Sequence, residues 1–354
     1  MRAKFLAMLL LILPAALAQA QGYGGLGTSA KGFDEVRPER RLSFPADHAQ
    51  HPGFRIEWWY VTANLQAADG SAMGVQWTLF RQALSPEARG TGWAAGQAWM
   101  GHAAVTTVTE HRFAEAFARG GIGQAGVTED PFEAFINDWS MRSTAPTGQD
   151  PLSDLRLVAR ADDFGYDLSL RAEGPLVLQG NEGYSVKSPQ GQASHYYSQP
   201  FYTLTGSVTL DGAAIPVTGT AWLDREWSSQ PLTGSQTGWD WFALNLPDGA
   251  RLMAYNLRDA DGGAYTPGTY IHPDGRPEPL ADGALILTEL DRETVAGREI
   301  PLRWRLALPA KGIDLTTAPL NAQSYMQVAF PYWEGPIEFT GTHEGVGYLE
   351  MTGY

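Results

Sequence analysis

Short runs of alternating apolar and polar residues follow one another along most of the chain. From about residue 55 onward, segments rich in Trp, Tyr, Val, Thr and Phe are separated by Asp-Gly, Pro-Asp-Gly and Gly-Gly. Alternation with a period of two is typical of half-buried strands, and these dipeptides favour hairpin turns. Helical periodicity is scarce, with one short turn predicted over 130–135, so the chain is predicted to be all-β and mostly antiparallel. The clearest predicted hairpins are 56–65 with 73–80 around Asp69-Gly70, and 202–210 with 215–223 around Asp211-Gly212.

Three pairs of segments recur in the same order, which indicates an internal duplication. Both segments of the first pair begin with Trp. Both segments of the second pair begin with two aromatic residues and end with Pro, and both segments of the third pair read aromatic-Leu-acidic. The duplication predicts two tandem β-domains over 37–229 and 230–354, and 354 residues are enough for a core in each. The pairs are 59–65 with 241–246, 196–200 with 332–336, and 222–224 with 348–350.

The start of the chain has the pattern of a secretory signal peptide. Residues 1–20 combine a basic start, an apolar run and a small-x-small cleavage site. A membrane anchor is the alternative, but Pro14 interrupts an apolar run that is shorter than the ~20 residues a bilayer requires. We therefore expect cleavage near Ala20, a flexible lead-in over 21–36, and a periplasmic or secreted protein.

The composition excludes several classes of function. With 25 basic and 39 acidic residues the net charge is −14, which repels phosphate backbones, so no nucleic-acid partner is expected. The absence of Cys removes disulfides, thiol nucleophiles, thiolate metal sites and a lipoprotein anchor. The His spacings match no common metal motif, there is no P-loop, and neither G-x-G-x-x-G match opens a helix after a strand. We therefore expect no metal and no cofactor.

The densest group of charged and aromatic residues ends the predicted strand 218–227. Alternation along a strand places Trp222 and Asp224 on one face. A carboxylate beside an indole is costly to bury unless it is paired, hydrogen-bonded or next to a wet cavity. His195 and Tyr197 are also two residues apart, and the second hairpin returns the chain past them. The four side chains are therefore predicted to converge at one barrel mouth.

Two interpretations of these four residues stay open. In the first, Asp224 is hydrogen-bonded to His195 in an aromatic-lined pocket and acts as a general acid, while Tyr197 and Trp222 stabilise a carbocation. In the second, Asp224 and its charged neighbours cap a barrel end through ion pairs, and His195 is an ordinary loop residue.

A second set of polar residues lies in and after the first hairpin. Glu57 and Arg81 fall on neighbouring strands and are predicted to form a buried pair, for which a structural salt bridge is favoured over catalysis. Gln76 precedes Arg81 on the same strand, and His102 starts an apolar strand where it lines a cavity or caps the strand. Together with Trp59, these are the candidate ligand-binding residues.

These motifs resemble those of the AttH/carotenoid 1,2-hydratase family. The resemblance implies two tandem lipocalin-like, calycin-type antiparallel β-barrel domains. In the family's hydratases a His-x-Trp and a Tyr-x-Asp pair carry function, and they fall on His195, Tyr197, Trp222 and Asp224 with the two aromatic residues exchanged. The resemblance rests on Glu57-Trp-Trp-Tyr60, His195-x-Tyr197, Trp222-x-Asp224-Arg-Glu-Trp227 and Gly347-Tyr-Leu-Glu350.

Members of that family include hydratases of isoprenoid double bonds, cyclases that fold polyenes, and exported proteins linked to ABC transport. The leading prediction is an exported protein that binds a hydrophobic lipid or isoprenoid-like molecule and transforms it by acid-type hydratase or hydrolase chemistry. One alternative is a non-catalytic periplasmic lipid carrier or ABC-transport accessory protein with peripheral membrane contact. A purely structural interaction module is the other.

Overall fold

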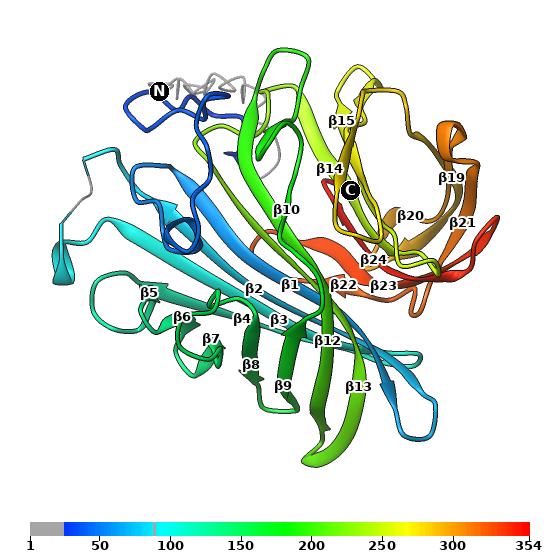
Figure 1. The fold of residues 1–354 in the computed structure, drawn as a ribbon, viewed down its shortest axis with the longest axis horizontal. Helices are drawn as coiled ribbons and strands as arrows, with labels where there is room; N and C mark the ends of the chain where they lie inside the picture. The colour runs from blue at the N-terminus through cyan, green and yellow to red at the C-terminus, as the bar shows by residue number, and fades with distance from the viewer. Residues whose placement is uncertain (1–24, 88–89) are drawn as a thin grey trace, which may run out of the picture.

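The computed structural model describes residues 25–87 and 90–354. It contains two curled antiparallel sheets, one after the other in the chain and joined by 229–235 (Figure 1). The prediction of an all-β fold is confirmed, and no helix in the described residues is long and apolar enough to cross a membrane. The predicted signal segment 1–20 lies outside the described residues. The short 3-10 turns are η2 (Ala46–His48), η3 (Gly92–Ala94) and η4 (Pro309–Lys311).

The first domain is built on a thirteen-stranded sheet. Its main path runs β4-β3-β2-β1-β13-β12-β9-β8-β7-β6-β5, and β10 and β11 pair with β12. The strands are β1 (Ile56–Ala67), β2 (Ala72–Ala83), β3 (Gln97–Thr107), β4 (His111–Arg119), β5 (Ala125–Glu129), β6 (Phe132–Ile136), β7 (Trp139–Ser143), β8 (Asp154–Arg160), β9 (Phe164–Ala172), β10 (Val177–Leu178), β11 (Tyr184–Val186), β12 (Ala193–Leu210) and β13 (Ala213–Ser228).

The second domain is built on an eleven-stranded sheet with the path β18-β17-β15-β14-β24-β23-β21-β20-β19. β16 pairs with β15, and β22 pairs with β23. In both domains the first strand pairs with the last, β1 with β13 and β14 with β24. The strands are β14 (Gln236–Asn245), β15 (Arg251–Asp259), β16 (Ala264–Tyr265), β17 (Gly268–Ile271), β18 (Pro277–Leu280), β19 (Ile286–Val295), β20 (Arg298–Leu308), β21 (Ile313–Pro319), β22 (Tyr325–Met326), β23 (Tyr332–Gly341) and β24 (Gly345–Thr352).

Both hairpins predicted from Asp-Gly pairs are confirmed, because β1 pairs with β2 and β12 pairs with β13. Asp211 and Gly212 have φ angles of 49° and 79°, in the left-handed region that a type I′ hairpin turn requires at both central positions. The helical turn predicted over 130–135 is wrong. Most of β6 lies in that segment, and its alternate residues are buried in the core, so the tertiary contacts favour a strand.

The strand pairings follow the same order in both domains, but the first strand is shifted by one residue relative to the predicted repeat. Trp241 pairs with Glu350 across β14 and β24, whereas Tyr60, and not Trp59, pairs with Asp224 across β1 and β13. The pairing of β12 with β13 corresponds to the pairing of β23 with β24. Each domain therefore presents an acidic residue at the same place on its last strand.

Both faces of the first sheet are covered where the two domains meet. Residues 193–202 of β12 and 221–228 of β13 are all buried. In the parts of both strands next to their hairpin turn, buried residues mostly alternate with more exposed ones. The inner face packs into the core of the first domain, and the outer face packs against the second domain. This interface contains a cluster of aromatic side chains that includes Tyr60, Tyr196, Trp222, Trp241, Tyr255 and Tyr348.

Candidate active site

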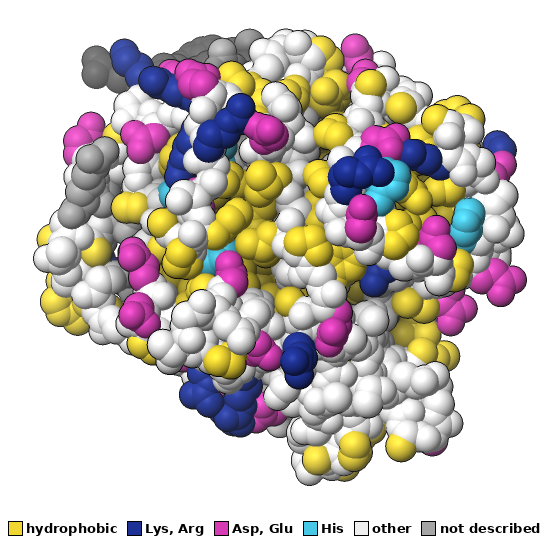
Figure 2. Space-filling model, in the orientation of Figure 1, with side chains coloured by type: hydrophobic (Ala, Val, Ile, Leu, Met, Phe, Trp, Pro, Cys, Tyr) yellow, Lys and Arg dark blue, Asp and Glu magenta, His cyan; other side chains and the backbone are white. Residues whose placement is uncertain are grey.

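A cavity of about 170 Å³ lies between the outer face of the first sheet and the second domain. We call it the interdomain cavity. Hydrophobic side chains also gather near the middle of the molecular face shown in Figure 2. The cavity wall comes from both domains and combines aromatic with charged side chains. Its aromatic residues include Trp58, Tyr60 and Phe80 from the first domain and Trp239, Trp241 and Tyr255 from the second.

Asp224 lies in the cavity wall at the buried end of β13. Its Oδ2 accepts a hydrogen bond from the Tyr196 hydroxyl (2.6 Å), and its Oδ1 accepts from Ser198 Oγ (2.5 Å) and Trp222 Nε1 (2.7 Å). All three donors are neutral. Burial raises the pKa of Asp224 to about 7, because the hydrogen bonds offset only part of the cost of removing the charge from water. Asp224 is therefore partly protonated near neutral pH and can donate a proton.

Glu350 on β24 is a second carboxyl in the same wall. It is half-buried. Its Oε1 accepts a hydrogen bond from Trp239 Nε1 (2.7 Å), and the Tyr60 hydroxyl lies next to it. The single hydroxyl proton of Tyr60 is donated to Glu334, a buried neighbour on β23, so Tyr60 does not donate to Glu350 at the same time. Burial raises the pKa of Glu350 to about 7 and the pKa of Glu334 well above its ordinary value.

One ion pair also faces the cavity. Lys187 Nζ lies 3.1 Å from Glu226 Oε1, and it lies 4.0 Å from the ring centre of Tyr255 and 4.7 Å from that of Tyr196. Burial lowers the pKa of Lys187, and the charge of Glu226 opposes that shift. Because Lys187 is held by Glu226 and the two phenol rings, it does not neutralise Asp224 directly. No salt bridge involving Asp224 occurs in residues 25–87 and 90–354.

His102 on β3 also lines the cavity. Its Nδ1 lies 2.9 Å from the Tyr332 hydroxyl, and its Nε2 lies 3.1 Å from Glu115 Oε1. Burial lowers the pKa of His102, which favours the neutral ring. Gln76 Nε2 also donates to the Tyr332 hydroxyl (3.4 Å), so two predicted ligand-binding residues meet at one tyrosine of the second domain. No group of three or more side chains suited to a metal ion occurs in the described part of the chain.

Comparisons with known proteins identify the family. The family model described as AttH-like matches residues 35–354. The chain belongs to the AttH-like family. The crystal structure of a proposed AttH protein from Nitrosomonas europaea is 32% identical with a TM-score of 0.80, and the match covers 91% of this chain and 100% of that chain. No curated protein matches the chain.

Two further crystal structures share the fold of this AttH-like protein at lower identity. Kievitone hydratase from Nectria haematococca is 17% identical with a TM-score of 0.67, covering 91% of this chain and 98% of that chain. CghA with Sch210972 is 12% identical with a TM-score of 0.53, covering 84% and 88%. The predicted family resemblance and the prediction of two tandem lipocalin-like domains are therefore confirmed.

The AttH-like fold does not bring the four predicted catalytic residues to one place. Trp222 and Asp224 face the interdomain cavity side of the sheet, where Asp224 lines the cavity. His195 and Tyr197 pair with β13 residues that point into the core of the first domain. The prediction that these side chains converge is therefore wrong.

A β-bulge in β12 is the cause. From the hairpin turn as far as Tyr202 the two strands pair without a break, and the register then shifts by one residue between Gln199 and Tyr202. Pro200 lies in this stretch and has no N–H to donate to the ladder. The N–H of Phe201 donates instead to Gln199 Oε1 (3.1 Å). Because side chains alternate, one extra residue exchanges the two faces of β12 beyond the bulge.

Tyr196 and Ser198 therefore take the place beside Asp224 that the sequence analysis assigned to His195 and Tyr197. His195 is fully buried, and neither ring nitrogen has a hydrogen-bond partner within the described residues. Burial lowers the pKa of His195 to about 4, so the ring is neutral at physiological pH. The Tyr197 hydroxyl lies 2.7 Å from His48 Nδ1 inside the first domain.

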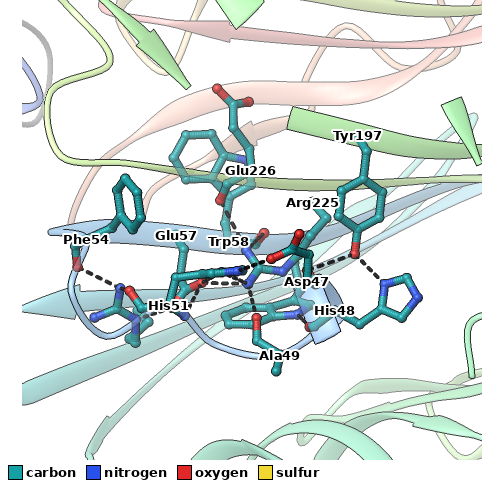
Figure 3. A network of polar contacts seen from close by, with 12 residues as sticks. Asp47, His48, Ala49, His51, Phe54, Glu57, Trp58, Tyr197, Arg225 and Glu226 are labelled. Carbon is teal, nitrogen blue, oxygen red and sulfur yellow. Dashed lines mark hydrogen bonds and ion pairs between the residues drawn. The ribbon is translucent and has the colours of Figure 1, made fainter. Parts of the chain in front are cut away.

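The predicted buried pair of Glu57 and Arg81 is confirmed. It belongs to a larger group on the inner face of the sheet, of which Figure 3 labels Glu57, His51 and Arg225. Glu57 also pairs with Arg225 (2.5 Å) and lies 3.2 Å from His51 Nδ1. The Arg225 guanidinium lies 3.7 Å from the ring centre of Trp59. Burial alone would raise the pKa of Glu57, but the two arginines hold it well below its ordinary value. We call these five residues the inner cluster.

The five predicted ligand-binding residues thus divide between two locations. His102 lines the cavity, and Gln76 contacts Tyr332 beside it. Glu57 and Arg81 also line the cavity, but their charged groups form ion pairs in the inner cluster, which also holds the ring of Trp59.

Sequence reasoning missed four residues of the site. Tyr196 and Ser198 were hidden by the bulge, and Lys187 has no local pattern that distinguishes it from a surface lysine. Glu350 did carry a signal, because the internal repeat aligns it with Asp224.

Proposed function

We propose that this AttH-like protein is a hydratase-type enzyme that adds water across a carbon–carbon double bond of a lipid or isoprenoid-like molecule bound in the interdomain cavity. The observation that carries the proposal is Asp224, a carboxyl held by three neutral donors in the wall of the interdomain cavity. The fold shared with kievitone hydratase, whose name states a hydration, supports this reaction class.

Asp224 performs the first step in this mechanism. Its proton and the π electrons of the alkene form a new C–H bond, which leaves a positive charge on the second alkene carbon. The aromatic side chains of the wall, among them Trp58, Trp241 and Tyr255, stabilise that charge. A water oxygen then bonds to the cationic carbon and loses one proton, and Asp224 regains a proton from solvent.

The size of the cavity limits what part of a substrate it encloses. A cavity of roughly 150 Å³ is enough to hold benzene, so about 170 Å³ accommodates one ring or one branched alkene unit. Phe330 lies in the wall and is 44% exposed, which marks an edge of the cavity near solvent. A longer substrate would therefore place its reacting end inside and its remaining chain outside.

The test is incorporation of heavy oxygen from labelled water. We expect the purified protein to convert geraniol or oleic acid into a hydrated product with one new, labelled hydroxyl group, and Asp224→Asn to lower the rate by about 10²–10⁴-fold. Asp314→Asn is the control, because Asp314 forms an exposed ion pair with Arg305 on the surface of the second domain. Equal turnover by Asp224→Asn would remove Asp224 as the acid.

The same preparation tests the carrier alternative. A stoichiometric, chemically unaltered lipid in the native protein, with no uptake of labelled oxygen by any alkene, would overturn the hydratase proposal in favour of a carrier. Export to the periplasm stays a prediction from residues 1–20, and fractionation of the native cells would test it.

A further inference from the structure

We propose that Glu350 is the second catalytic carboxyl of the cavity and acts as the base that takes a proton from the attacking water, while Asp224 acts as the acid. The inference rests on the proposed hydratase function. It adds a residue from the second domain, so that the reaction would require both halves of the duplicated chain.

The duplication places the two carboxyls at equivalent positions on the last strand of each domain. Asp224 pairs with Tyr60 across the first and last strands of the first domain, and Glu350 pairs with Trp241 across the corresponding strands of the second. Both carboxyls line the same cavity, Asp224 from the first domain and Glu350 from the second. Their charges interact, because ionised Asp224 raises the pKa of Glu350.

The two carboxyls also have matching surroundings. An indole N–H donates to each at 2.7 Å, from Trp222 to Asp224 and from Trp239 to Glu350. A tyrosine hydroxyl lies next to each as well. Neither carboxyl forms a salt bridge in the described residues, and burial raises the pKa of both to about 7.

The supporting hydrogen bonds cross between the domains. Tyr60 of the first domain donates to Glu334 of the second and lies next to Glu350. In the other direction, Trp241 Nε1 of the second domain lies 3.4 Å from the Tyr196 hydroxyl, which itself donates to Asp224. Each carboxyl is thus positioned partly by the other domain, so the pair is set by the docking of the two sheets.

Hydration of an alkene needs one proton donor and one proton acceptor. The alkene carbon takes a proton from Asp224, the other carbon takes the water oxygen, and the remaining water proton goes to Glu350. The sum is alkene plus water giving alcohol, with one proton moved from Asp224 to Glu350 and returned through solvent. A pair of carboxyls with similar pKa values near neutrality suits this exchange, and dehydration would use the same groups in reverse.

The decisive variants are Glu350→Gln and Glu350→Asp, assayed on geraniol or oleic acid in labelled water. Glu350→Gln is expected to lower the hydration rate by about 10²–10⁴-fold, the usual contribution of a general base, and Glu350→Asp to recover part of it. A base acts when ionised and an acid when protonated. The unmodified protein should therefore show a bell-shaped pH profile, and Glu350→Gln should lose its rising acid limb.

The outcomes separate this inference from the proposed function. If Asp224→Asn is inactive and Glu350→Gln keeps its rate and both limbs, Glu350 is not the base and the hydratase proposal stands. If Asp224→Asn keeps its rate, the proposed function itself fails. Circular dichroism and thermal melting of Glu350→Gln distinguish a lost base from a lost fold, and a conserved melting temperature with lost activity supports the inference.

A measurement without substrate tests the same pair. Difference infrared spectra should show protonated carboxyl bands that disappear as the pH rises through about 7, and Glu350→Gln and Asp224→Asn should each remove part of that signal. Glu338→Gln is the matched control, because Glu338 is an exposed glutamate on β23 that pairs with β24. A signal unchanged by Glu350→Gln would overturn the assignment of Glu350.

Discussion

Asp224 and Arg225 are neighbours in the chain, but their side chains lie on opposite faces of β13. The pKa of a buried carboxyl is shifted in opposite directions on the two faces. On the inner face, Glu57 is surrounded by Arg81 and Arg225, which hold its pKa well below the ordinary value. On the cavity face, Asp224 is surrounded by neutral donors, and burial raises its pKa to about 7. Both carboxyls are almost wholly buried, so the charge of the neighbours decides the difference rather than the depth of burial.

This difference separates structural carboxyls from reactive ones. An ionised carboxylate between two guanidinium groups does not exchange a proton near neutral pH. It neutralises the charges of Arg81 and Arg225, which would otherwise be buried without a counter-ion. A carboxyl held only by hydroxyl and indole donors keeps a raised pKa, so it can hold or release a proton near neutral pH, as proton transfer requires.

Glu57→Gln should have the largest effect on stability. It leaves Arg81 and Arg225 buried without their carboxylate, for which we expect a loss of about 3–5 kcal/mol in the free energy of unfolding. Guanidinium denaturation measures it. Asp314→Asn, in an exposed ion pair, should change the same quantity by about 0–1 kcal/mol. A loss below about 1 kcal/mol for Glu57→Gln would mean that the inner cluster is not the structural element proposed here.

Asp224→Asn should have the converse profile, with a large loss of activity and little loss of stability. Asparagine keeps an oxygen for Ser198 and Trp222, and the Tyr196 hydroxyl can accept from its amide, so the free energy of unfolding should change by about 1 kcal/mol or less. The hydration rate should fall by about 10²–10⁴-fold because the proton donor is gone. Parallel denaturation and turnover assays check this, and a loss of stability as large as that of Glu57→Gln would remove the contrast between the two faces.

The pH dependence of stability should separate the faces in the folded protein without any substrate. Asp224 and Glu350 have pKa values raised to about 7, so between about pH 4 and 7 the folded state binds protons that the unfolded state has released. Their contribution to stability therefore falls as the pH rises, by up to about 1.4 kcal/mol per pH unit for each carboxyl.

Glu57 of the inner cluster contributes with the opposite sign and only near or below its ordinary pKa, so it adds little to that slope above about pH 5.5. The pKa of Glu57 is lowered, so its stabilising contribution is complete above the ordinary glutamate value and is lost only in stronger acid. Denaturation curves measured from pH 4 to 7 should therefore show a flatter slope for the Asp224→Asn, Glu350→Gln double variant. The same slope in the double variant and the unmodified protein would contradict the raised pKa values.

His195→Leu should have the smallest effect. The imidazole is neutral, fully buried and without a hydrogen-bond partner in the described residues, so an apolar side chain of similar size should change the free energy of unfolding by about 1 kcal/mol or less. Because His195 lies on the inner face, turnover should stay within about two-fold, well short of the loss expected for a catalytic base. A loss of activity as large as that of Asp224→Asn would place His195 in the mechanism after all.

Part of the candidate site was predictable from the sequence. The same-face placement of Trp222 and Asp224 follows from strand alternation, and Trp222 does donate to Asp224. The pairing of Glu57 with Arg81 follows from the first hairpin and its turn. The partners of Asp224 on β12 were not predictable, because counting residues back from the Asp211-Gly212 turn gives the wrong face once the bulge is passed.

The sequence by itself determined the elements of this protein: short alternating strands, Asp-Gly hairpins and a duplication that sets one acidic residue at the same position on the last strand of each sheet. These are properties of neighbouring residues, and local alternation and turn conformation are enough to specify them. Only the tertiary structure decided which face of β12 meets Asp224 and that the second domain covers the outer face of the first sheet. Both depend on contacts between residues far apart in the chain, and those contacts leave Asp224 and Glu350 in one cavity, where neither forms a salt bridge within the described residues.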